Sequence, residues 1–187
     1  RQIAADAGTT IGMVYYYYPT KDDLFLAVVE SVYANLLVDA EKALAPDVPA
    51  EQRIERMYAR LAAATDVEFD VMRIIIREAL VSSERLEKIA DRMLHGHIPW
   101  LLRTFADGRA DGKLDPNVPL PLQLGATMAI GVIPQLVLRR LRDAHMPIAD
   151  SLPPASAVPK FLVDVLLHGL GGPSLPARER PVVPQQE

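Results

Sequence analysis

The sequence predicts an all-α protein. Apolar residues recur at intervals of three or four through most of the 187 residues, which is the spacing of a helix face. The segments between these periodic stretches are short and are marked by Pro and Gly, as connections between helices commonly are. Ile74-Ile75-Ile76 has strand propensity, but charged residues at helical spacing flank it and favour helix. Helices packed on helices are therefore expected.

Two short helices separated by a tight turn are expected at the start. The first segment has an apolar face that can pack inward, made of Ile3, Ala4 and Ala7. Gly8 follows, where a helix end favours a residue that adopts positive φ. Thr9 and Thr10 can cap the second helix, and Pro19 ends it because it disfavours the α region for the preceding residue. This is the layout of a helix-turn-helix, whose second helix enters the DNA major groove.

A long helix is expected over 21–44. Thr20 and Asp23 are spaced as in a capping box. The expected inward stripe consists of Leu24, Phe25, Val28, Val32, Leu36 and Ala40.

Five further helices are expected, over 50–65, 67–81, 84–106, 121–143 and 157–170. In the second of these, Phe69, Met72, Ile76 and Leu80 are expected to point inward. Ser82 or Ser83 would cap the third, and Pro99 would kink it. Pro134 would kink the fourth, and the last would stop at Gly169 or at Gly171-Gly172. The expected domains are residues 1–44 with the helix-turn-helix and linking helix, 45–172 for ligand binding and dimerisation, and a Pro-rich tail over 173–187. Pro181 and Pro184 form a weak PxxP pattern, for which a plain tail is the alternative.

The start of the chain resembles the helix-turn-helix of the tetracycline-repressor (TetR) family of bacterial transcription regulators. The matching features are Ile3-Ala4-x-x-Ala7-Gly8, Thr10-x-Gly12-x-Val14-Tyr15, an aromatic block, and then Pro19-Thr20-Lys21-Asp22-Asp23-Leu24-Phe25. The resemblance covers residues 1 to about 30. Family members begin with a further helix, often after a basic arm, so the DNA-binding domain is expected to be truncated at its N-terminus.

The resemblance assigns roles within the reading helix. Phosphate contacts are implied for Thr10, Tyr15 and Lys21, and base-edge contacts for Thr9, Ile11, Gly12, Met13 and Tyr16. The alternative for the four tyrosines is packing, but four consecutive helical residues point four ways. Tyr15 and Tyr16 are therefore expected to face DNA and Tyr18 to lie in the small core.

The charge distribution argues mildly against tight DNA binding. The formal net charge is −4, and residues 1–47 hold three basic side chains against seven acidic ones. Weak non-specific binding is therefore expected of this chain.

The longest apolar stretch, 118–138, carries no charge but contains Pro119, Pro121, Gly131 and Pro134. We interpret it as a buried helix and expect no membrane span. The last two helices are apolar on more than one face, and in the family the corresponding pair forms a four-helix dimer interface. A homodimer is therefore expected, with a buried hairpin in a monomer as the alternative. The chain has no cysteine, and a cytoplasmic protein is the simplest interpretation.

The sequence offers little for catalysis, and no enzyme activity, cofactor or metal is expected. His95 and His97 diverge on a helix by about 200° and cannot share a metal ion. There is no metalloprotease, phosphate-loop or nucleophile-elbow motif. An all-α hydrolase or lyase with a dispersed site is the alternative.

A ligand pocket is expected between the middle helices. Its candidate lining residues are Tyr58, Phe69, Met72, Ile76, Met93, His97, Trp100, Phe105, Met128 and Gln135. Core packing is an equal alternative for each, and for His97 a satisfied core histidine is favoured. Glu78 is a buried acid or a rim residue. An apolar lining implies a hydrophobic or amphipathic small molecule.

These observations predict a homodimeric regulator that binds double-stranded operator DNA. It would act as a repressor that an unknown small-molecule effector releases from a palindromic site. The alternative is a helical ligand-binding or scaffold module without DNA function.

Overall fold

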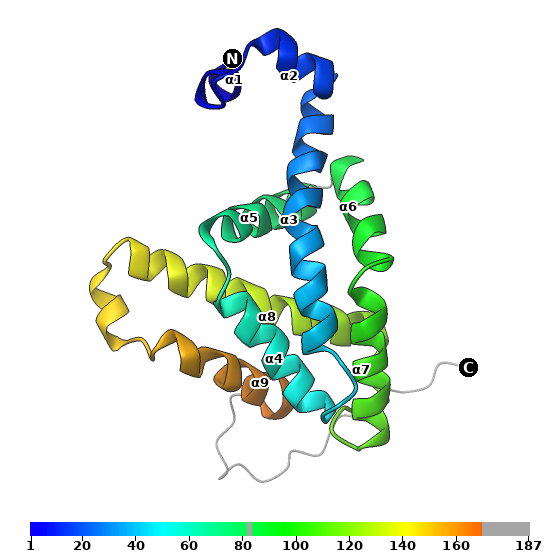
Figure 1. Cartoon of the computed structure of the whole chain (residues 1–187). Helices are drawn as coiled ribbons and strands as arrows, with labels where there is room; N and C mark the ends of the chain where they lie inside the picture. The colour runs from blue at the N-terminus through cyan, green and yellow to red at the C-terminus, as the bar shows by residue number, and fades with distance from the viewer. Residues whose placement is uncertain (82–83, 170–187) are drawn as a thin grey trace.

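The computed structural model describes residues 1–81 and 84–169, and every regular element within these ranges is helical. The α-helices are α1 (Gln2–Asp6), α2 (Ile11–Tyr17), α3 (Lys21–Ala43), α4 (Ala50–Ala62), α5 (Asp66–Val81), α6 (Glu84–Leu94), α7 (Ile98–Ala110), α8 (Leu120–Asp143) and α9 (Val158–His168), with 3-10 turns η1 (Pro147–Ser151) and η2 (Ala155–Ala157) before α9. The all-α prediction is confirmed. Figure 1 shows α1 and α2 at one end of the molecule, joined by α3 to a body formed by the other helices. The expected Ser82 or Ser83 cap, the stop at 171–172 and the tail over 173–187 lie outside the described residues.

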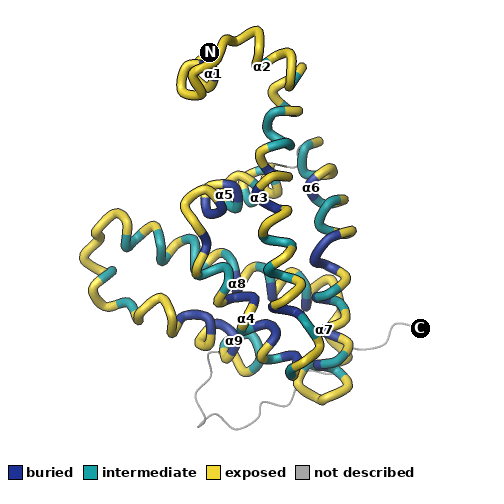
Figure 2. The backbone as a smooth tube through the Cα atoms, in the orientation of Figure 1, coloured by how far each residue is buried: buried dark blue, intermediate teal, exposed yellow. Residues whose placement is uncertain are grey.

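The main core lies where α4 meets α7, α8 and α9. Tyr58, Ile54, Leu101, Phe105 and Val163 are each at most 1% exposed. Figure 2 shows buried backbone concentrated around these helices and exposed backbone over α1 and α2.

The contact of α4 with α8 depends on a glycine. A Cβ built on Gly131 of α8 would lie 2.1 Å from Cε1 of the Tyr58 ring. The Tyr58 hydroxyl donates to the backbone carbonyl of Thr127 at 2.7 Å, and burial raises the Tyr58 pKa. A glycine at this turn of α8 therefore lets the tyrosine lie against the helix backbone.

A smaller apolar cluster joins α3 to α5 and α6 through Val29, Val32, Val71 and Ile89. The α3 face therefore differs from the expected stripe: Val28 is 43% exposed, whereas Val29 is 7% exposed. The phase of the stripe is wrong by one residue at this point, because Val28 and Val29 are equally apolar and only the positions of α5 and α6 distinguish them.

The helix expected over 84–106 is two helices. The break falls at His95, Gly96 and His97, and Pro99 lies in the first turn of α7 instead of inside a helix. A proline is tolerated there because the first-turn amides have no intrahelical acceptor. A Cβ on Gly96 would lie 2.1 Å from the Tyr33 hydroxyl, so α3 approaches this break closely.

Two apolar positions are more exposed than expected. Ile3 of α1 is 60% exposed and Leu80 of α5 is 82% exposed. The buried helix expected over 118–138 is also wrong for a single chain: only Gln123, Thr127 and Gly131 of α8 are buried. By length and mean hydropathy α8 is the one described helix that could cross a membrane. Only 17% of its apolar window is buried within the protein.

Candidate DNA interface and ligand cavity

The helix-turn-helix is built from local signals. Gly8 has φ 63°, which reverses the chain after α1. Thr10 caps α2 by accepting the Met13 amide on its hydroxyl at 3.3 Å. Thr20 and Asp23 then form a reciprocal capping box at the start of α3, in which each side chain accepts the other residue's amide.

All eight residues assigned to DNA by resemblance are exposed: Thr9, Thr10, Ile11, Gly12, Met13, Tyr15, Tyr16 and Lys21. Six of them lie on α2 or its cap, and Lys21 is the first residue of α3. Because the Thr10 oxygen is the acceptor in the cap, its hydroxyl proton remains available to a phosphate. The structure thus brings these residues to one end of the molecule.

The aromatic block is divided by burial. Tyr15, Tyr16 and Tyr17 are 52%, 77% and 65% exposed, whereas Tyr18 is half-buried. The Tyr16 and Tyr17 rings meet edge to face, with centroids 5.2 Å apart. Both exposed rings belong to α2, the helix that the resemblance assigns to the DNA major groove.

A cavity of about 290 Å³ lies between α3 and helices α4, α5, α6 and α8. Its lining is mainly aliphatic and contains four methionines, with Tyr33, Arg60 and His97 as the residues that carry polar groups. The lining residues are Tyr33, Leu36, Leu37, Ala40, Ala43, Met57, Arg60, Leu61, Met72, Ile75, Ile76, Met93, His97, Met128, Ala129, Val132 and Ile133. Such a wall suits an apolar small molecule, and methionines adapt to its shape.

The ten expected pocket residues separate into three groups. Met72, Ile76, Met93, His97 and Met128 line this cavity. Phe69 and Gln135 line a second hollow, of about 340 Å³, which also reaches Met72. Tyr58, Trp100 and Phe105 line neither and pack in or against the main core. Glu78 is half-buried and lies 3.5 Å from Arg85.

His97 and Tyr33 form the polar pair of the cavity wall. The Tyr33 hydroxyl lies 2.8 Å from Nδ1 of His97 and accepts the His97 backbone amide at 3.2 Å. His97 is 9% exposed, and burial lowers its pKa to about 4, so the ring is neutral at physiological pH. Burial also raises the pKa of Tyr33.

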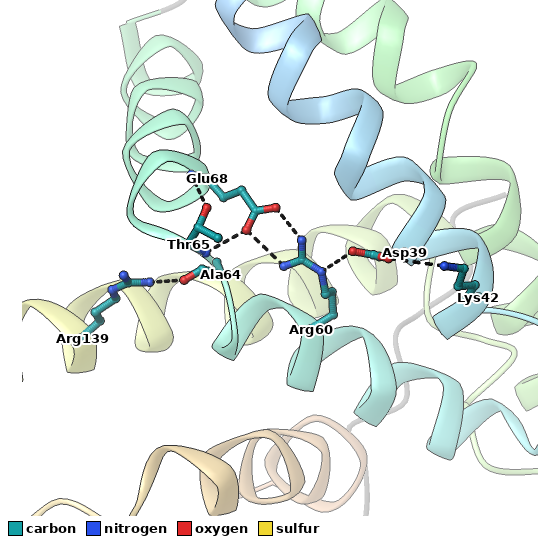
Figure 3. Close-up of polar contacts among 7 residues, drawn as sticks. All are labelled: Asp39, Lys42, Arg60, Ala64, Thr65, Glu68 and Arg139. Atoms are coloured by element: carbon teal, nitrogen blue, oxygen red, sulfur yellow. Dashed lines mark hydrogen bonds and ion pairs between the residues drawn. The ribbon is translucent and has the colours of Figure 1, made fainter.

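Arg60 is the charged group of the wall, and its charge is matched by two carboxylates (Figure 3). Its guanidinium donates to Asp39 of α3 at 2.7 Å and to Glu68 of α5 at 2.5 Å. Glu68 also accepts the Thr65 amide at 2.8 Å, and the Thr65 hydroxyl accepts the Glu68 amide at 3.3 Å, so the two residues cap α5. The Arg60 guanidinium holds the pKa of both carboxyl groups below their usual range. Arg60 therefore fastens α3 to the α4–α5 corner at the edge of the cavity.

The α3 side of the cavity was not predicted. Tyr33 and Leu37 of α3 are absent from the expected pocket because α3 was expected to serve only as a link between the domains. Arg60 of α4 is absent from it as well. One signal was available: Val29, Tyr33, Leu36 and Ala40 recur at helical spacing, one face away from Val28. Such a signal marks an inward face, but it does not distinguish a cavity wall from a packed core.

Among the described residues, no group of three or more His, Asp or Glu side chains is placed to hold a metal ion.

The comparisons with known proteins concern the first part of the chain. Residues 1–28 match the family described as "Bacterial regulatory proteins, tetR family". No curated protein matches the chain. The matched residues include α1, α2 and the capped start of α3, so the match and the helix-turn-helix geometry identify the same segment. Residues 1–28 therefore form a tetR-family helix-turn-helix segment, and this segment supports a DNA-binding transcriptional regulator of that type.

Proposed function

We propose that the protein is a homodimeric repressor that binds a palindromic operator and is released from it by a small hydrophobic ligand. The observation that carries the proposal is the position of the apolar cavity against α3. Leu36, Leu37 and Ala40 of α3 line the cavity, and the same helix continues without a break to Lys21, next to the reading helix. A molecule that fills the cavity contacts the helix that carries the DNA-binding end.

Release requires a ligand that favours the non-binding arrangement. A hundredfold loss of operator affinity corresponds to a preference of about 2.7 kcal/mol. A cavity that binds a ligand mainly through apolar contacts supplies this preference if α3 must shift to admit it. Besides the Arg60–Asp39 pair, two ionic contacts that locate α3 are partly exposed: Arg85 with Asp22 at 2.8 Å, and Arg92 with Glu30 at 2.8 Å. Exposed pairs of this kind stabilise one arrangement only weakly.

The proposed dimer uses α8 and α9. Leu122 and Val137 of α8 and Phe161 of α9 are 64%, 51% and 56% exposed. A Cβ on Gly125 would have no heavy atom within 4 Å, so a second chain's backbone could approach closely there. Pro134 and three arginines near the end of α8 argue for a protein partner over lipid. Two-fold pairing would present two reading helices about 34–36 Å apart, one DNA turn.

Selection of bound sequences from random DNA by the full protein tests class and symmetry together. The expected result is an inverted repeat whose half-sites are centred about one helical turn apart. Recovery of unrelated sequences would contradict the operator proposal. Sedimentation at micromolar concentration tests the dimer separately, since a monomer would give a mass of 20.6 kDa. Partition of the protein into lipid vesicles would contradict the assignment of α8 to a dimer interface.

A further inference from the structure

The hydrogen bonds around Tyr33 determine which nitrogen of His97 carries the proton. The Tyr33 oxygen accepts the His97 backbone amide at 3.2 Å and lies 2.8 Å from Nδ1. Tyr33 is 6% exposed, so its hydroxyl proton needs a protein acceptor, and Nδ1 is the one that the structure offers. The hydroxyl therefore donates to Nδ1. A neutral ring whose Nδ1 accepts carries its proton on Nε2.

Nε2 of His97 is then a donor without a protein acceptor. Among the described residues, the one hydrogen bond of the His97 ring is that between Nδ1 and Tyr33, and the side chain lines the cavity. The residue is 9% exposed and its ring lines the cavity, so Nε2 is open to whatever fills the cavity. The wall around it offers aliphatic and methionine side chains, so the acceptor has to be brought by what fills the cavity.

The cavity also discriminates by charge. Within the described chain, Arg60 is the one charged side chain in its lining, and Asp39 and Glu68 both accept from its guanidinium. No positive charge is left to balance an acidic ligand, and Glu68 is only 8% exposed. Transfer of an unpaired carboxylate into this wall is strongly unfavourable.

We propose that the effector is an uncharged, mainly aliphatic molecule with one carbonyl-type acceptor, which binds the Nε2 proton of His97. Tyr33 is a positioning residue that presents this donor. The proposal rests on the cavity being the effector site, as proposed above. It adds the chemical class of the ligand and the residue that selects it.

Three probes of similar length separate the contributions of the hydrogen-bond acceptor and of the ligand charge: methyl heptyl ketone, octyl chloride and nonanoate. The ketone supplies one neutral acceptor, the chloride supplies almost none, and nonanoate supplies a negative charge. Each is titrated into the full protein by calorimetry. The expected result is that the ketone binds about tenfold more tightly than the chloride, the value of one hydrogen bond, and that nonanoate binds most weakly.

Variants at His97 locate the preference. His97→Leu removes the donor, and the ketone and the chloride are then expected to bind equally. His97→Asn retains an amide donor and should keep part of the preference. Binding of octyl chloride by each variant shows that its cavity is intact. Nitrogen-15 NMR of the wild-type imidazole gives a second readout, in which Nε2 is protonated and its resonance moves with the ketone and not with the chloride.

The outcomes distinguish a failure of this inference from a failure of the proposed function on which it rests. Equal binding of ketone and chloride by the wild-type protein, or an unmoved Nε2 resonance at saturating ketone, would overturn the role of His97 and leave a ligand-binding cavity. If His97→Leu keeps the ketone preference, the role is likewise wrong. If no probe binds the wild-type protein, the effector site itself is refuted, and the proposal fails with it.

Discussion

Tyr33 of α3 and His97 of the α6–α7 break are joined by two hydrogen bonds, of 2.8 Å to the ring and 3.2 Å from the backbone. The rings also contact each other, with centroids 5.8 Å apart. Gly96 makes this approach possible because any Cβ there would overlap the tyrosine hydroxyl. The contact places α3, which leads to the helix-turn-helix, against the wall of the cavity. A ligand bound to His97 would therefore contact a residue that touches α3 directly.

The neutral state of His97 predicts a pH dependence of stability. Its pKa is lowered from 6.5 to about 4 in the folded protein by burial, so the unfolded chain binds the additional proton between these values. The free energy of unfolding should therefore fall as the pH drops through this window, by about 2 kcal/mol at pH 5 and about 3 kcal/mol at pH 4.

Urea denaturation of the wild-type protein and of His97→Asn, at a series of pH values, measures this contribution. The difference between the two proteins cancels the carboxylates, which titrate in both. A difference that does not change between pH 7 and pH 4 would contradict a buried, neutral His97.

Arg60 should contribute far more to stability than an exposed arginine in a similar ion pair. Arg60→Met leaves Glu68, whose side chain is 10% exposed, without its main partner, and should lower the free energy of unfolding by about 3 kcal/mol. Arg73→Met is the matched control, because Arg73 and Asp70 are 53% and 64% exposed. That substitution should cost less than about 0.5 kcal/mol. Equal costs, measured by denaturant unfolding, would refute the structural role of Arg60.

Gly131 should not tolerate a methyl group. Gly131→Ala places a Cβ 2.1 Å from the Tyr58 ring and should destabilise the protein by about 2–3 kcal/mol, because Tyr58 is fully buried and has no room to move. Gly12→Ala is the control, since its Cβ would meet only Thr10 Oγ1, at 3.8 Å. Thermal unfolding of the two variants measures the contrast. A Gly131→Ala protein as stable as Gly12→Ala would contradict the α4–α8 packing.

Lys21 and Lys42 lie at opposite ends of α3 and provide a matched test of the DNA interface. Lys21→Ala should weaken binding to all sequences about equally and reduce the salt dependence of the logarithm of the affinity by about one unit, as the loss of one phosphate contact requires. Lys42→Ala, some 21 residues away along the same helix, should leave both unchanged. Fluorescence anisotropy at several salt concentrations measures the slopes. Identical slopes for the two variants would exclude Lys21 from the phosphate contacts.

Local chemistry accounts for what the sequence by itself determined. Gly8, the Thr10 cap, Pro19 and the Thr20–Asp23 box act within three or four residues of themselves, so the helix-turn-helix and the start of α3 were predictable from neighbours in the chain. The all-α class follows for the same reason, since helical periodicity is a property of each segment.

Tertiary structure decided which residues form the cavity. Val28 and Val29 are equally apolar, and the positions of α5 and α6 decide which of the two is buried. Met72 lines the cavity and Tyr58 fills the core, although both were candidates for the pocket. The pairings of Tyr33 with His97 and of Arg60 with Asp39 span 64 and 21 residues. Whether an inward side chain meets another side chain or an empty volume depends on how distant helices cross, and no pattern within one helix contains that information.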